Sequence, residues 1–147
     1  MLILLLRTIT EKKIGGDIAE LGVYKGNTAK LIHYFLPERK LHLFDTFEGF
    51  AKQDVVAEKE RMDFPLPEND FGDATLSLVK RNISPKNNNV VFYQGYFPNS
   101  ISETLNDLRF AFVHLDADLY KPTLEGLKFF YPRMSSRGLI LVHDYNA

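Results

Sequence analysis

Two hydrophobic runs in the C-terminal third of the sequence are each followed by acidic residues. The run FAFVHL is followed by Asp116 and Asp118, and the run GLILV is followed by His143 and Asp144. A buried strand does not carry such acids for stability, because desolvating a carboxylate is unfavourable unless a cation receives it. The carboxyl ends of parallel strands meet at one edge of a sheet, where carboxylates can ligate a metal. The pattern therefore predicts a metal or cation site at that edge.

A glycine-containing motif, ELGVYKGNT, stands at a predicted strand-to-helix junction. Gly22 permits a tight turn, and Gly26 would let the start of the helix approach a ligand closely. Asn27 or Thr28 is the expected N-cap. Glu20 stands where a pyrophosphate-binding loop has its first glycine, and its charge would repel a pyrophosphate, which favours a positively charged ligand. The alternative is an ordinary turn that contains two glycines.

A second motif, FDTFEGF, places Asp45 at the end of the next predicted strand. Asp45 lies about 20 residues after Gly26, where doubly wound folds have the acid that binds ribose hydroxyls. The alternative is a surface acid at a strand end. Together the two motifs predict a nucleoside ligand over the ends of the first two strands.

Strands alternate with helices along the chain, which predicts an α/β fold with a doubly wound, mostly parallel sheet covered on both faces. A short helix is also expected within AKQDVVAEKERM, a turn at 135–138, and a helix or strand at the N-terminal MLILLLR. The expected strands are 17–23, 41–45, 90–94, 110–116 and 139–143, and the expected helices are 27–36, 74–81, one beginning at Ser100, and 121–131.

Composition bounds the function classes. A length of 147 residues predicts one domain, and a formal net charge of -1 gives no electrostatic case for binding nucleic acid or an anionic membrane. The absence of cysteine excludes disulfides and thiolate metal sites and suits a cytoplasmic protein. The six apolar residues before Arg7 are too few to span a bilayer, so no membrane association is expected.

The motifs ELGVYKG, LFDTFEGF, QGYFPNSI, HLDADLYKPT and VHDY occur in this order. With them the chain resembles the S-adenosylmethionine-dependent methyltransferases, specifically the macrocin O-methyltransferase-like (TylF-type) group, from about Gly16 to Tyr145. The resemblance implies the Rossmann-like class I methyltransferase fold, a single S-adenosylmethionine-binding domain, and O-methylation of a sugar or natural-product hydroxyl. The residues that it assigns to cofactor binding are Glu20, Gly22, Gly26, Asn27, Thr28, Asp45, Thr46, Phe47, Gln94, Gly95 and Tyr96.

The resemblance also implies a catalytic centre. Asp118 would be the general base that takes the acceptor's hydroxyl proton, and Asp116, His143 and Asp144 would hold a divalent ion, usually magnesium in relatives. Relatives end the last of these strands in two acids, whereas this chain has His143 before Asp144. Magnesium prefers oxygen ligands, so the histidine weakens magnesium binding, favours a transition metal such as manganese, or marks a lost site.

The family fold has seven strands, and this sequence supplies five, without the last two. The fifth strand is then an exposed edge, which predicts a homo-oligomer formed through residues 138–142. Two further functions stay open at this point. One is a nucleotide-sugar glycosyltransferase in which DAD is a DxD metal motif, although this leaves both cofactor motifs unexplained. The other is a non-catalytic protein that only binds S-adenosylmethionine.

Overall fold

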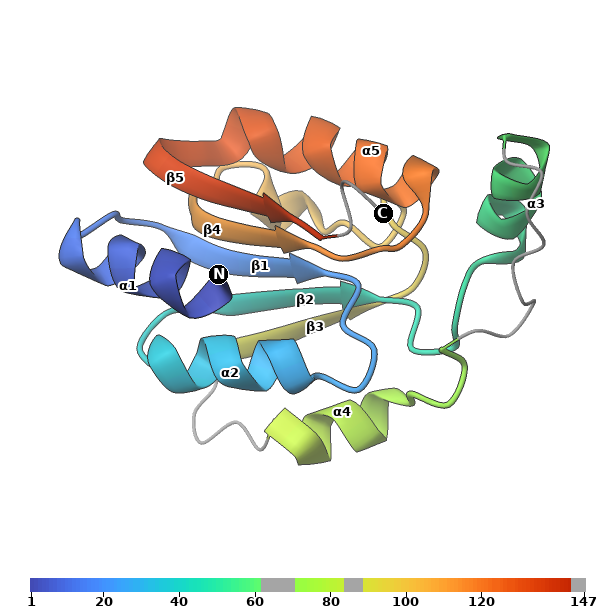
Figure 1. The fold of residues 1–147 in the computed structure, drawn as a ribbon, viewed down its shortest axis with the longest axis horizontal. Helices are drawn as coiled ribbons and strands as arrows, with labels where there is room; N and C mark the ends of the chain where they lie inside the picture. Colours follow the sequence, from blue (N-terminus) through green and yellow to red (C-terminus); the bar gives the residue numbers. More distant parts are fainter. Residues whose placement is uncertain (62–70, 84–88, 144–147) are drawn as a thin grey trace.

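The computed structural model describes residues 1–61, 71–83 and 89–143. A five-stranded parallel sheet forms its centre, with the strand order β3-β2-β1-β4-β5 (Figure 1). The order reverses between β1 and β4, as expected for a doubly wound sheet, so the predicted fold class is confirmed. The strands are β1 (Asp17–Leu21), β2 (Leu41–Asp45), β3 (Val90–Gln94), β4 (Phe110–Leu115) and β5 (Met134–Val142).

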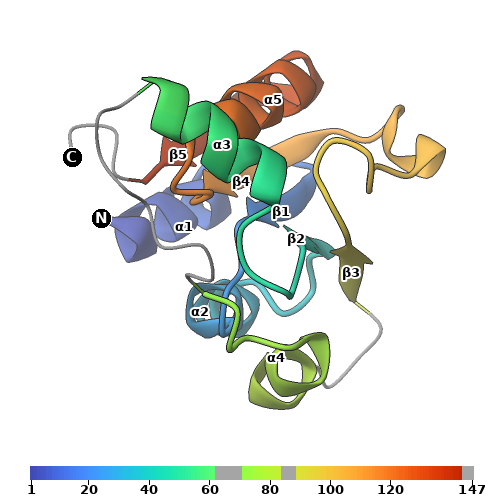
Figure 2. The same ribbon diagram turned by 90° about the vertical axis from the view of Figure 1, so that its right-hand side faces the viewer.

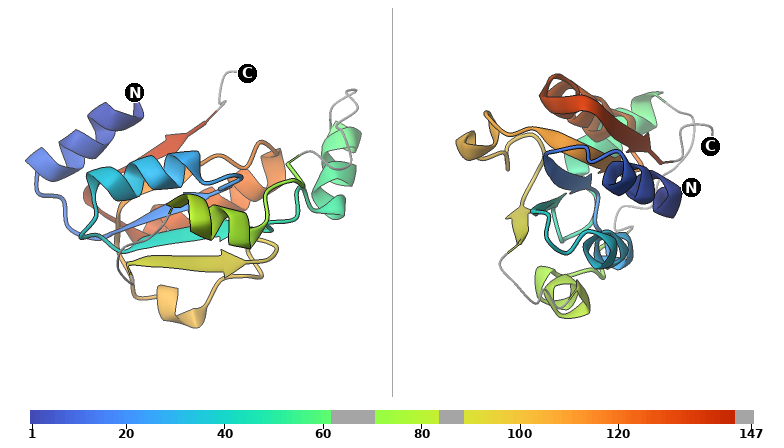
Figure 3. Two further views of the ribbon diagram at one scale, coloured as in Figure 1. Left: turned by 90° about the horizontal axis from the view of Figure 1, so that it is seen from below. Right: turned by 90° about the vertical axis from the view of Figure 1, so that its left-hand side faces the viewer.

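Helices cover both faces of this sheet (Figure 2). The helices α1, α2 and α4 pack on one face, and α5 with the short helix η1 packs on the other. The helix α3 lies beyond the carboxyl ends of the strands (Figure 3, left). The helical elements are α1 (Leu2–Glu11), α2 (Asn27–Phe35), α3 (Lys52–Arg61), α4 (Leu76–Ile83), α5 (Tyr120–Phe130), and the 3-10 turns η1 (Glu103–Leu105) and η2 (Tyr131–Arg133).

The central strands are mostly apolar on both faces because each face has its own helical layer. Ile18 and Phe112 contribute to the core beneath α1 and α2, whereas Ala19 and Val113 contribute to the core beneath α5. Since side chains alternate along a strand, neighbouring residues necessarily enter opposite cores. All of β4 is buried as a result, which explains why its sequence reads as a continuous hydrophobic run ending in acids.

Two sequence predictions differ from the observed elements, and the expectation for the N-terminal run is met. The turn predicted at 135–138 lies inside β5, where strand pairing shifts register and Arg137 has a φ of 67°. The helix predicted from Ser100 is the 3-10 turn η1, capped by the side chain of Ser102. The apolar N-terminal run forms the helix α1, and among the described residues no helix is long and apolar enough to cross a membrane.

Candidate functional site

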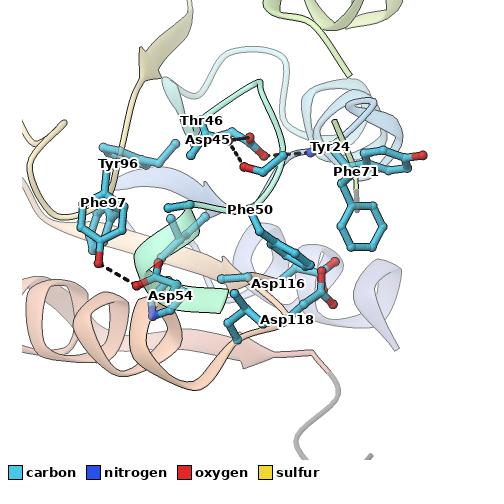
Figure 4. Close-up of a pocket in the computed structure, with 18 of the residues that line it drawn as sticks. Tyr24, Asp45, Thr46, Phe50, Asp54, Phe71, Tyr96, Phe97, Asp116 and Asp118 are labelled. Atoms are coloured by element: carbon cyan, nitrogen blue, oxygen red, sulfur yellow. Dashed lines mark hydrogen bonds between the residues drawn. The ribbon is translucent and has the colours of Figure 1, made fainter. Parts of the chain in front are cut away.

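Two adjoining cavities lie at the carboxyl ends of the strands, and several site residues predicted from the sequence line them. Gly22, Tyr24, Phe71, Asp116 and Asp118 border both cavities. The first cavity extends between the loops after β2 and β3 towards α3, and Figure 4 shows its lining. The second extends along the start of α2. The sheet therefore delivers the predicted motifs to one place.

Asp45, the last residue of β2, joins the two loops that border the first cavity. Its Oδ2 accepts hydrogen bonds from the backbone N–H groups of Val23 (2.6 Å) and Tyr24 (3.0 Å), and its Oδ1 accepts one from Phe47 (2.7 Å). Bonds from N–H groups to a carboxylate are stronger than neutral ones. Asp45 thus fixes the loop after β1 against the loop after β2, besides lining the cavity.

Gly22 allows the end of β1 to touch the end of β4. The residue has a φ of 85°, and a Cβ built on it would overlap the backbone carbonyl of Asp116. The backbone N–H of Asp116 donates to the carbonyl of Leu21 at 2.8 Å. A glycine at this position therefore keeps the glycine motif in direct contact with the acidic motif that follows β4.

The structure gives Gly26 a role in helix packing, whereas its motif suggested that it lets a ligand approach the start of the helix. It is the N-cap of α2 with a φ of 78°, and a Cβ there would lie 2.8 Å from a Val79 methyl group and 3.3 Å from Ile83. Both contacts belong to α4. The missing side chain of Gly26 accommodates helix packing, and among the described residues Gly26 lines neither cavity.

Glu20 and His114 form a buried pair on β1 and β4. Glu20 is 1% exposed, and its Oε1 lies 2.9 Å from His114 Nδ1. Burial raises the pKa of Glu20 to about 7, although the hydrogen bond from His114 opposes the rise. Burial lowers the pKa of His114, but the hydrogen bond and charge of Glu20 outweigh this effect and raise it overall. The second oxygen, Oε2, is buried without a hydrogen-bond partner among the described residues, and Glu20 lines the second cavity.

Asp116 and His143 lie together at the ends of β4 and β5. His143 Nδ1 is 2.9 Å from Asp116 Oδ1, and both residues border the second cavity. Asp118, with a φ of 57°, borders both cavities. Within residues 1–61, 71–83 and 89–143, no three histidine or acidic side chains converge into a metal-binding group, and the predicted ligand Asp144 lies outside these ranges.

Most of the residues assigned from the sequence meet at the two cavities. Phe47 and Gln94, like Gly26, do not line them: Phe47 is a buried core residue and Gln94 is the exposed end of β3. The assigned residues that do line them are Glu20, Gly22, Asn27, Thr28, Asp45, Thr46, Gly95, Tyr96, Asp116, Asp118 and His143.

Sequence reasoning missed Asp54 and part of the aromatic lining. Asp54 lies on α3, and no motif in the sequence links that polar helix to a ligand. Tyr24 and Phe71 stack edge-on with ring centroids 4.8 Å apart, and Phe50 packs against Phe71 at 5.2 Å. The aromatic residues after β1, after β2 and before α4 are the sequence feature that could have indicated this wall of the cavity.

Comparison with known proteins shows which family the chain matches and which of its members are similar to it. The family described as macrocin O-methyltransferase (TylF) matches residues 2–147. Mycinamicin III 3''-O-methyltransferase from Micromonospora griseorubida is 28% identical over 90% of this chain and 56% of its own length. A tetracenomycin-type rhamnosyl 4'-O-methyltransferase from Streptomyces olivaceus is 26% identical, over 94% of this chain and 56% of the relative. The chain thus spans little more than half the length of these curated relatives.

Solved structures show the same fold. The O-methyltransferase NovP superposes with a TM-score of 0.83 at 24% identity, covering 97% of this chain and 62% of that protein. The calicheamicin methyltransferase CalS11 superposes with a TM-score of 0.80 at 21% identity, with the same coverage.

Proposed function

Because this chain belongs to the macrocin O-methyltransferase (TylF) family, we propose that it binds S-adenosylmethionine and transfers the methyl group to a hydroxyl of a sugar or other natural product. The curated relatives methylate oxygen atoms of such compounds, according to their names. The observation that carries the proposal is the pair of cavities that meet at Gly22, Asp116 and Asp118.

The two cavities suit the two halves of the cofactor. The first cavity, with Asp45 and aromatic walls, would hold the adenosine. The Asp45 carboxylate already accepts three backbone N–H groups, so of its roughly four lone-pair sites about one would remain for a ribose hydroxyl. The second cavity would hold the methionine part. There Oε2 of Glu20, which has no hydrogen-bond partner within the part of the chain that the structure describes, would accept a hydrogen bond from the ammonium group.

Methyl transfer at this site needs a base beside the acceptor hydroxyl. Asp118 borders both cavities, so its carboxylate would accept the hydroxyl proton while the oxygen attacks the methyl carbon. The carbon–sulfur bond of the sulfonium would break as the carbon–oxygen bond formed, and a neutral thioether would leave. Methyl transfer needs the sulfur, the methyl carbon and the acceptor oxygen in line, and walls that held them so would remove much of the entropic barrier.

The proposal includes a divalent ion beside Asp118, although no three histidine or acidic side chains converge within the described residues. Asp116 offers a carboxylate and His143 an imidazole, at 2.9 Å from one another, and Asp144 follows next in the sequence. This mixture of oxygen and nitrogen donors fits manganese better than magnesium. When bound, the ion would act as a Lewis acid on the acceptor's oxygens. Calorimetric titration should show tighter binding of manganese than of magnesium, and His143→Asp should reverse the preference. Equal binding before and after the substitution contradicts the assigned ligand.

Thermal-shift titration tests the proposed cofactor. S-adenosylhomocysteine, the product form of the cofactor, should raise the melting temperature in a saturable way, because a ligand that binds only the folded state stabilises it. Uridine diphosphate with manganese should have no effect. The opposite pattern would favour a glycosyltransferase, in which Asp116 and Asp118 hold a metal–diphosphate complex. Stabilisation by S-adenosylhomocysteine without binding of any divalent ion would favour a non-catalytic binding protein.

We also propose that two copies associate through β5. This strand is the last of the sheet, and among the described strands it pairs only with β4, so its outer edge presents unpaired backbone groups. Residues Leu139 to Val142 remain partly exposed. Light scattering over a concentration series should show a dimer or larger species. A single monomeric species at the highest concentration contradicts the proposal.

A further inference from the structure

The helix α3 is held in place by two buried carboxylates one turn apart. Asp54 is 4% exposed and Glu58 is 6% exposed, although the helix is otherwise strongly polar. Burying a carboxylate is unfavourable unless partners satisfy it, so each of these acids needs an explanation in its surroundings.

The docking of α3 against α5 accounts fully for the burial of the Glu58 carboxylate. Its Oε1 accepts hydrogen bonds from Arg61 Nε (3.2 Å) and Nη2 (2.7 Å), and its Oε2 accepts one from the backbone N–H of Tyr120 (3.0 Å). Tyr120 is the first residue of α5, where free N–H groups and the helix dipole favour an acid. Both oxygens are therefore occupied, and Glu58 lines neither cavity.

For Asp54, the contacts between α3 and its neighbours account for only one of the two buried carboxylate oxygens. Its Oδ1 accepts a hydrogen bond from the Tyr96 hydroxyl at 2.9 Å, and Lys121 Nζ lies 3.7 Å from the same oxygen. Its Oδ2 receives no hydrogen bond from any residue that the structure describes. Unlike Glu58, Asp54 lines the first cavity, and Figure 4 shows it beside Tyr96 and Phe97.

The position of Asp54 within the cavity indicates which part of a nucleoside it would meet. In Figure 4, Tyr24 and Phe71 lie at one side, Tyr96 with Asp54 lies at the opposite side, and Asp45 lies between them. If Asp45 meets the ribose and the sulfonium lies towards the second cavity, then the base must lie towards Tyr96 and Asp54. This step rests on the proposed function, because it takes the ligand to be S-adenosylmethionine.

We propose that Asp54 is a specificity residue, whose Oδ2 accepts a hydrogen bond from the exocyclic 6-amino group of adenine. A carboxylate offers acceptors only, so it matches an amino group and repels the carbonyl oxygen that a 6-oxo purine presents at the same position. Tyr96 and Lys121 fix the orientation of Asp54 through Oδ1 and leave Oδ2 for the base. The site would thus select adenine by attraction and reject hypoxanthine by repulsion.

Calorimetry with S-adenosylhomocysteine and S-inosylhomocysteine tests this role, because the two ligands differ at the 6-position of the base. The wild-type protein should bind the adenosyl compound about 10- to 100-fold more tightly, the range expected for a hydrogen bond to a charged group. Asp54→Asn keeps the shape of the side chain but can donate from its amide to a 6-oxo group. The affinity ratio should therefore fall by about 10-fold or more.

Glu58→Gln is the matched control, because it alters the other buried carboxylate of the same helix outside the cavity. Its affinity ratio should equal that of the wild type. If Asp54 only docks α3, Asp54→Asn will weaken both ligands equally and leave the ratio unchanged, which overturns the proposal. A wild-type protein that binds both compounds equally overturns it as well. A wild-type protein that binds neither compound overturns the proposed function together with this inference.

Discussion

Replacing Gly22 by alanine should destabilise the fold and disrupt the cavities, because β1 and β4 touch at this residue. Two separate penalties apply. The residue has a φ of 85°, a left-handed conformation that side chains other than hydrogen disfavour. In addition, a Cβ would overlap the carbonyl oxygen of Asp116, which is rigid backbone and cannot rotate away. Relief requires that the ends of the two strands move apart.

The structure allows the size of the effect to be worked out. The left-handed conformation costs about 1–2 kcal/mol for an alanine, and overpacking a tight contact costs about 1–3 kcal/mol. Together they predict a loss of about 2–5 kcal/mol, against a total stability of about 5–15 kcal/mol for a typical domain. Because Asp116 must move, binding of S-adenosylhomocysteine should weaken as well.

Two other glycines separate these contributions in a urea-unfolding series. Gly95 has a φ of 132° but only an ordinary contact at 3.6 Å, so Gly95→Ala should show the conformational cost alone, about 1–2 kcal/mol. Gly15 has no atom within 4 Å of the Cβ position, so Gly15→Ala should stay within about 1 kcal/mol of the wild type. A Gly22→Ala variant no less stable than Gly15→Ala would refute the reasoning.

Three further outcomes are expected. Asp45→Asn should lower the free energy of unfolding in urea titrations by at least about 2 kcal/mol. The reason is that one amide oxygen cannot replace a carboxylate that accepts three backbone N–H groups. An unchanged free energy of unfolding would contradict this. Between about pH 4.5 and 7 the wild type should lose stability as the pH rises, since burial raises the pKa of Glu20 to about 7 and the folded state alone keeps that proton. The raised pKa of His114 adds a loss of the same sign only above its ordinary value of 6.5. Glu20→Gln should flatten the dependence below that pH, and a stability that increases over this range contradicts the assignment. Arg61→Ala should accelerate amide hydrogen exchange throughout α3, because it removes two hydrogen bonds from buried Glu58, whereas exchange at the wild-type rate would show that they do not hold the helix.

The strands of the sheet were predictable because each one is marked by a pattern in its own few residues. Short runs such as FAFVHL, rich in aromatic and β-branched residues, favour a strand buried on both faces, and the acids that follow them mark the strand ends. The irregular part of β5 was not predictable in this way. The residues Ser135 to Gly138 resemble a turn, and Arg137 does adopt a left-handed conformation, but the flanking residues pair with β4 on both sides of the irregularity.

The site was predictable where a motif sits at a strand end and unpredictable where it depends on distant side chains. Asp45 and Asp116 follow directly from the strand pattern. The importance of Asp54 depends on a hydrogen bond from Tyr96, which lies far along the chain, and on the docking of a polar helix by buried acids. The structural role of Gly26 likewise depends on the approach of α4, which no local pattern in its own motif indicates.

Hydrogen-exchange mass spectrometry with and without S-adenosylhomocysteine tests the central claim most directly, because it shows where the cofactor binds. The account predicts ligand-dependent protection of peptides covering residues 20–28, 45–54, 94–97 and 116–119, which border the two cavities. Peptides from α1 and the start of β5 should exchange as before. Protection confined to other segments, or no protection at saturating ligand, would contradict a cofactor site at the carboxyl ends of the strands.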